Sequence, residues 1–141
     1  MSSRASQASA LDERGQSVTV YVVLVTAALI MTTGLVVDGG QKVAASSRAE
    51  AAAAGAARAA GNASATQALA GKDSPSSAVT AARAHLAGES GITGSVSVSA
   101  GVVTIRTESR APTLFLSVIG IDQVTATGAA DANIVATGQT R

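Results

Sequence analysis

The sequence predicts an α+β protein in which a long N-terminal helix crosses a membrane and continues outside it. A small domain with a second helix and a three-stranded antiparallel sheet follows. Three observations carry this prediction: residues 15–37 contain no charge, residues 43–60 are mostly alanine, and from Gly94 onward apolar and polar residues alternate with a period of two. We therefore divide the chain into a tail (residues 1–14), a membrane helix (15–37), an alanine-rich helix (38–61) and a small domain (62–141).

The uncharged run lies between Arg14 and Asp38. Its roughly 23 residues would extend about 34 Å as a helix, which exceeds the roughly 30 Å of a hydrocarbon core. One alternative is a signal peptide cut near residues 43–45, although the apolar run is long for one and Asp38 and Lys42 precede the cut. The other is a buried helix of a soluble protein, for which an aromatic content of 1% leaves little packing material.

Composition excludes several classes of function. The net charge is only +1 and the ten basic residues are scattered along the chain, so no nucleic-acid partner is predicted. The chain has no cysteine and one histidine, so thiolate sites, disulfides and histidine zinc clusters are not expected. The acidic residues outside the apolar run show no spacing typical of a shared catalytic site. We therefore predict a protein that is not an enzyme, with no catalytic, cofactor-binding or metal-binding residues, no cofactor and no small-molecule substrate.

The alanine-rich segment continues the helix beyond the membrane, because alanine is the strongest helix former. We expect a bend at Gly39 and Gly40, the end of the helix near Gly61, and a loop over residues 61–73. The small side chains of this segment permit close approach of another helix or a sheet.

A second helix is predicted over residues 75–87. Ser74 is placed to cap it, Pro75 suits the first helical position and Gly88 suits its end. His85 lies off its apolar stripe and is expected to face solvent.

Alternation predicts the sheet. Residues 94–99 and 102–108 form a hairpin around a tight turn at Ala100 and Gly101, and residues 123–137 form a third strand that pairs antiparallel with the hairpin.

Residues 113–121 form the most apolar stretch outside the membrane run. The stretch is too short to span a bilayer and too uniform to separate helix from strand, and we favour a short helix. Its large side chains either fill the thin core or stay exposed to contact a partner or the membrane surface. The candidate contact residues are Leu114, Phe115, Leu116, Val118 and Ile119.

The first 60 residues resemble TadE/TadG-like proteins of the tight adherence (Tad, or Flp) pilus system, particularly actinobacterial forms. The residues that carry the resemblance are Glu13, Arg14 and Gly15, the valine-rich run with Tyr21, residues 34–40, and the alanine-rich helix. Residues 110–121 and the strand after them resemble the second half of such proteins more loosely.

The way in which Tad prepilins are processed suggests one candidate cleavage site in this chain. The family's peptidase cuts after a glycine, and Glu and Tyr stand fifth and sixth beyond the cut. If Gly15 is that glycine, Gln16 begins the mature chain and Tyr21 is sixth, but the fifth residue is Val20. The missing carboxylate favours the unprocessed TadG-like members.

The resemblance implies a non-catalytic, single-pass, pilin-like accessory component of a Tad pilus or secretion system. It also implies a cytoplasmic N-terminus and an extracytoplasmic domain in the cell membrane, an orientation that charge alone leaves open. The expected partners are the lipid bilayer and other membrane proteins of that system. Ala27, Ala28 and Gly34 are the candidates for packing against other membrane helices. The alternatives are a filament subunit cut after Gly15 and an anchored extracellular binding module unrelated to pili.

Overall fold

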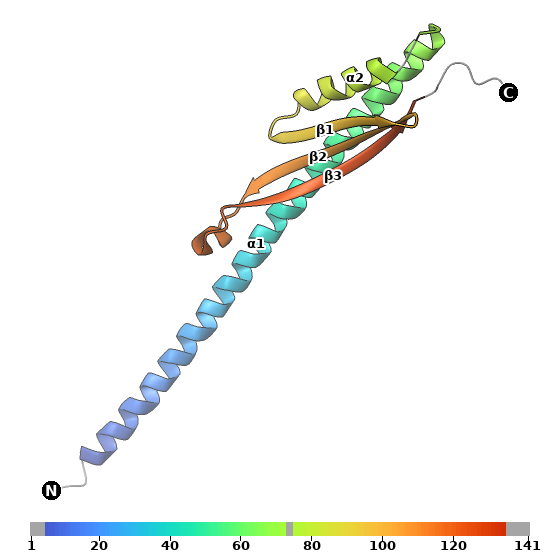
Figure 1. Cartoon of the computed structure of the whole chain (residues 1–141). Helices are drawn as coiled ribbons and strands as arrows, with labels where there is room; N and C mark the ends of the chain where they lie inside the picture. Colours follow the sequence, from blue (N-terminus) through green and yellow to red (C-terminus); the bar gives the residue numbers. More distant parts are fainter. Residues whose placement is uncertain (1–4, 73–74, 135–141) are drawn as a thin grey trace.

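In the computed structural model, which describes residues 5–72 and 75–134, a very long helix carries a small sheet and a second helix near its C-terminal end (Figure 1). Side chains are described from residue 17 onward. The elements are α1 (Ala5–Leu69), α2 (Pro75–Ala87), β1 (Ile92–Ser99), β2 (Val102–Pro112), the 3-10 helix η1 (Leu116–Ile119) and β3 (Gln123–Asn133). The predicted α+β class is confirmed. The expected cap Ser74 and residues 135–137 of the third strand lie outside the described residues.

Helix α1 is longer and more regular than expected. It begins at Ala5, within the predicted tail, and passes Gly39 and Gly40 without a break, so the bend expected there is absent (Figure 1). Helix formation is cooperative, and the strong helix formers on both sides outweigh a glycine penalty of about 1 kcal/mol each.

The end of α1 was also wrongly predicted, because the helix continues past Gly61 to Leu69. Ser64 is buried and donates a hydrogen bond to the Gly61 carbonyl, and Thr66 donates one to the Asn62 carbonyl. Both hydroxyls therefore bond to backbone carbonyls within the helix. Helix α2 packs beside this last part of α1, which supports the extra turns.

The sheet has the three antiparallel strands that were predicted. Their order is β1-β2-β3, so the third strand pairs with the second strand of the hairpin. The hairpin turns at Ala100 and Gly101, whose φ angles of 49° and 77° are both positive. Two such residues form a type I′ turn, whose twist matches that of the flanking strands. In the register that results, Val98 is opposite Val103.

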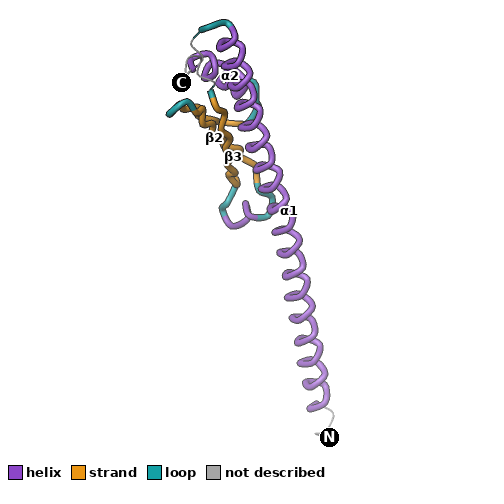
Figure 2. The backbone as a smooth tube through the Cα atoms, turned by 90° about the vertical axis from the view of Figure 1, so that its right-hand side faces the viewer, coloured by secondary structure: helices purple, strands orange, loops and turns teal. Residues whose placement is uncertain are grey.

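The core is built from alanine. One face of α1 packs against the sheet and α2, and its buried residues are Ala45, Ala49, Ala52, Ala53, Ala56, Ala57 and Ala60. The sheet contributes Val103 and Ile105, while α2 contributes Ala78, Ala82 and Leu86. The helices lie on one face of the sheet, and small side chains let the two layers approach closely (Figure 2).

The closest approach is between β3 and α1. A Cβ added at Gly128 would lie 2.5 Å from the carbonyl carbon of Ala49. Beside it, the buried Thr107 hydroxyl lies 2.7 Å from the Ala49 carbonyl oxygen, to which it donates. Backbone therefore packs directly on backbone at this point.

The side chain of His85, which was expected to face solvent, is 37% exposed and only partly meets that expectation. A Cβ added at Gly55 would lie 2.3 Å from Nε2 of His85, so the half-buried imidazole lies against α1. Its Nε2 is also 3.7 Å from the Glu89 carboxylate. The glycine on α1 provides the space for the ring.

Candidate functional site

The N-terminal half of α1 extends away from the sheet with its apolar side chains uncovered (Figure 1). The mean hydropathy of its most apolar window is 2.4, and only 6% of that window is buried within the chain. Within residues 5–72 and 75–134, this is the one helix that is long and apolar enough to cross a membrane. Its large exposed residues include Val18, Val20, Tyr21, Val22, Val23, Leu24, Leu29, Ile30, Met31, Leu35 and Val36.

The apolar run ends at Asp38, whose carboxylate holds the loop between β2 and β3. One oxygen lies 2.8 Å from the backbone nitrogen of Leu114. The other lies 3.1 Å from that of Phe115 and 2.7 Å from that of Leu116. Three amides at the start of η1, which would otherwise lack partners, thus donate to one side chain on a distant helix.

Asp38 is 2% exposed, and no basic side chain among those the structure describes forms an ion pair with it. The hydrogen bond from the Leu114 amide lowers the pKa of Asp38 below its ordinary value of 3.8, with help from the Leu116 and Phe115 amides. Burial opposes this effect by raising the pKa, and the hydrogen bonds prevail. The carboxylate is therefore ionised at neutral pH and stabilised by backbone dipoles.

One turn before Asp38, Gly34 lies beneath Phe115. A Cβ at Gly34 would be 2.4 Å from Cγ of Phe115, so only glycine leaves space for the ring in this position. Gly34 and Asp38 are four residues apart and therefore share a face of α1. Together they form the site on α1 that holds the loop, which we call its seat. Gly34 leaves space for the Phe115 ring, and the Asp38 carboxylate accepts hydrogen bonds from the loop amides.

The β2–β3 loop, residues 113–122, is closed at its base. The backbone N–H of Thr113 donates to the Asp122 carbonyl, and the Thr113 hydroxyl donates to that of Ile121. Its central residues form the short helix η1, as favoured from sequence. Of the two alternatives for its large side chains, filling of the core is wrong and exposure holds. Leu114, Phe115, Val118, Ile119 and Ile121 are exposed, and only Leu116 is half-buried.

The structure brings together two residues that the sequence had assigned to different surfaces. Gly34 was a candidate for packing against partner helices, and Phe115 a candidate for contact with a partner or the membrane surface. Within this chain they contact each other, whereas Ala27 is half-buried and Ala28 is exposed. Gly15 and Gln16 lie within the helical backbone of α1.

Sequence reasoning missed the role of Asp38. Its partners are 76 to 78 residues away, and side-chain-to-backbone pairing over such distances leaves no local pattern. A signal that could have found it is the placement of an acid directly after an apolar run, four residues after a glycine.

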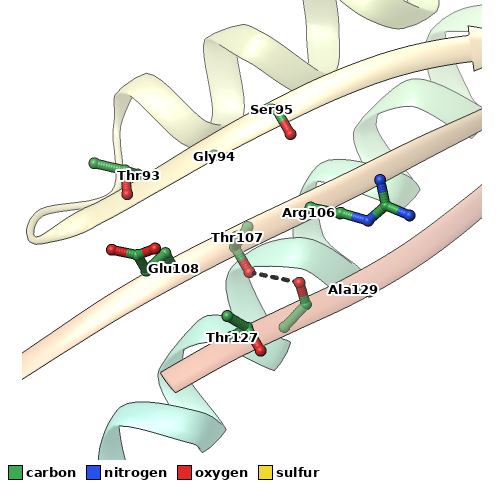
Figure 3. A pocket seen from close by; sticks show the side chains of 9 residues that line it. Thr93, Gly94, Ser95, Arg106, Thr107, Glu108, Thr127 and Ala129 are labelled. Carbon is green, nitrogen blue, oxygen red and sulfur yellow. Dashed lines mark hydrogen bonds between the residues drawn. The ribbon is translucent and has the colours of Figure 1, made fainter. Parts of the chain in front are cut away.

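The sheet also carries a shallow depression of about 600 Å³, lined by Thr93, Gly94, Ser95, Arg106, Thr107, Glu108, Thr127, Gly128 and Ala129. Figure 3 shows Arg106 and Glu108 on the central strand, together with the hydroxyl of Thr107 bonded to β3. No group of three or more metal-ligating side chains occurs among the residues whose side chains are described. The depression is open and holds no arrangement typical of catalysis.

Comparison with known proteins agrees with the N-terminal features. Residues 15–67 match the Tad family model, described as "Putative Flp pilus-assembly TadE/G-like". No curated protein and no solved structure matches the chain. The match covers the apolar run, Gly34, Asp38 and the alanine face of α1. It confirms the predicted resemblance: residues 15–67 are similar to the TadE/G-like family of the Flp pilus-assembly type.

Proposed function

We propose that this chain is a non-catalytic, single-pass accessory component of a Tad/Flp pilus assembly or secretion system. The observation that carries the proposal is the division of one TadE/G-like helix into an uncovered apolar half and an alanine half that packs against a small domain. In this proposal the N-terminus is cytoplasmic, residues 15–37 lie in the membrane, and the sheet and α2 form an extracytoplasmic head.

The head would act by contact with other components. Its core uses small side chains, and the loop at Asp38 fixes its position along α1. Ala27 and Ala28 remain candidates for contacts with partner membrane helices, because small residues permit close helix approach. Gly34 would act chiefly within the chain, as the seat for Phe115.

Topology is testable because the chain has no cysteine of its own. Ser97→Cys lies on exposed β1, and Ser9→Cys lies before the apolar run. In intact cells or spheroplasts, a membrane-impermeant maleimide should label position 97 directly and position 9 only after permeabilisation. The reverse pattern would contradict the orientation.

The pilus role requires a second test in the native host. Deletion of the gene should reduce assembled Flp pili or secreted product, and the wild-type chain should restore them. Cross-linking from a cysteine at Ala28 should recover other membrane proteins of the same system, with exposed Ser97→Cys as the control. Normal pilus assembly in the deletion strain would instead favour the unrelated anchored binding module.

A further inference from the structure

The β2–β3 loop presents apolar side chains at the level where the apolar part of α1 ends. Leu114, Val118 and Ile119 are 60%, 85% and 71% exposed. The contacts of Phe115 with Gly34 and of Leu116 with Asp38 fix this level along the helix. Figure 2 shows the segment between β2 and β3 beside α1.

The helix surface at the same level is also apolar. Leu35 and Val36 are 66% and 70% exposed. Between Arg110 and Asp122 the loop contains no charged residue. The loop and the helix therefore form one apolar surface, which is continuous with the apolar surface of the predicted membrane helix (residues 15–37).

The polar groups of the loop are largely used within the chain. Three amides donate to Asp38, and those of Val118, Gly120 and Ile121 donate to carbonyls of the loop itself. The Ser117 hydroxyl donates to the Leu114 carbonyl. Internal pairing of this kind is what a segment needs when it leaves water for lipid, because lipid offers no replacement partners.

We propose that the β2–β3 loop enters the interfacial region of the bilayer that α1 spans, with Leu114, Val118 and Ile119 in contact with lipid. The proposal rests on the membrane anchorage proposed above and adds a second membrane contact to it. The loop and α1 would then hold the head at a fixed tilt and height on the membrane. Lipid is favoured over a protein partner by the continuity with the apolar run and by the internal pairing of the loop.

The test places an environment-sensitive fluorophore on single cysteines of the full chain. Val118→Cys reports on the loop, Ser97→Cys on the exposed strand β1, and Leu29→Cys on the middle of the apolar run. All three positions are exposed within the chain, so labelling removes no core contact. The purified variants are reconstituted in vesicles of phosphatidylethanolamine and phosphatidylglycerol.

We expect the label at position 118 to show blue-shifted emission, quenching by nitroxides attached near the lipid headgroups, and protection from aqueous iodide. Position 97 should be open to iodide, and position 29 should be quenched best by nitroxides deep in the acyl chains. An iodide-accessible label at 118 beside an embedded label at 29 would overturn the loop proposal alone. Exposure of both 118 and 29 would overturn the anchorage itself.

A protein partner gives a different result. Position 118 would then be open to iodide in vesicles of purified protein and protected only in native membranes. That outcome would replace lipid with another component of the assembly and so overturn the proposal.

Discussion

The backbone nitrogen of Leu116 lies 2.7 Å from a carboxylate oxygen of Asp38, although 78 positions separate the two residues. This hydrogen bond and those of Leu114 and Phe115 attach the β2–β3 loop to the long helix where its apolar run ends. The attachment of the loop to the helix therefore depends on the side chain that first breaks the apolar run.

Asp38→Asn should release the loop. The amide side chain is nearly the same size, but it has no charge and replaces one acceptor oxygen with a donor, and charge-assisted hydrogen bonds are roughly twice as strong as neutral ones. In hydrogen–deuterium exchange of the full chain in detergent, residues 114–116 should exchange at least about tenfold faster. Asp131→Asn, at an exposed position of β3, is the matched control and should leave these rates unchanged. Equal protection in both variants would mean that Asp38 does not hold the loop.

Loop attachment should also depend on pH, with its transition in acid. The pKa of Asp38 is lowered below 3.8 in the folded chain, so the ionised carboxylate contributes its full stabilisation at pH values above 3.8. The contribution is lost as the pH falls through the lowered pKa. The NMR amide shift of Leu116 should therefore stay constant from neutral pH to about 4 and change only below it. The transition should be absent in Asp38→Asn, and a midpoint above 3.8 would contradict the stabilisation of the anion.

Substitution of glycine by alanine in α1 should stabilise the helix at Gly40 and loosen the β2–β3 loop at Gly34. Gly40→Ala meets open space and should stabilise the helix by up to about 1 kcal/mol, measured by thermal unfolding in detergent. Gly34→Ala puts a Cβ 2.4 Å from Cγ of Phe115 and should displace the ring, which would increase exchange at residues 114–116. In the double variant with Phe115→Ala, the added effect of Gly34→Ala on loop exchange should disappear, because the clash is gone. Additive effects of the two changes would show that this contact does not seat the loop.

The difference between local contacts and contacts between residues far apart in the sequence explains how much of the structure could be predicted. The hairpin at Ala100 and Gly101 was predictable because alternation and turn chemistry are local. Gly39 and Gly40 suggested a bend because the propensity of single residues leaves out the cooperativity of a long helix. The residues after Gly61 suggested a loop because local propensity carries no information about packing against α2. The sequence marks Asp38 only as an acid directly after an apolar run, four residues after Gly34. It does not indicate what the two residues contact, because the loop that they hold lies almost 80 residues later.

Gly128→Ala tests the contact of the sheet with α1. The new Cβ would lie 2.5 Å from the Ala49 carbonyl carbon, and a backbone atom cannot move aside as a flexible side chain can. Overpacking of this kind costs about 1 to 3 kcal/mol, so the midpoint of thermal unfolding should fall by several degrees. Thr127→Ala, at the neighbouring exposed position, should change stability by no more than about 0.5 kcal/mol. Equal stability of the two variants would mean that β3 does not approach α1 this closely.

The mature N-terminus should lie before Gln16. Cleavage after Gly15 would create a positively charged amine at the start of the apolar run, and an unpaired charge within a membrane costs at least a few kcal/mol. The fifth residue after this position is Val20, which supplies no carboxylate to neutralise the amine of a neighbouring subunit. Intact-mass spectrometry of the chain purified from its native membrane should therefore detect residues before Gly15. Gly15→Ala should leave that mass unchanged apart from the substitution itself. A wild-type mass that begins at Gln16, together with a longer chain in Gly15→Ala, would instead identify a processed filament subunit.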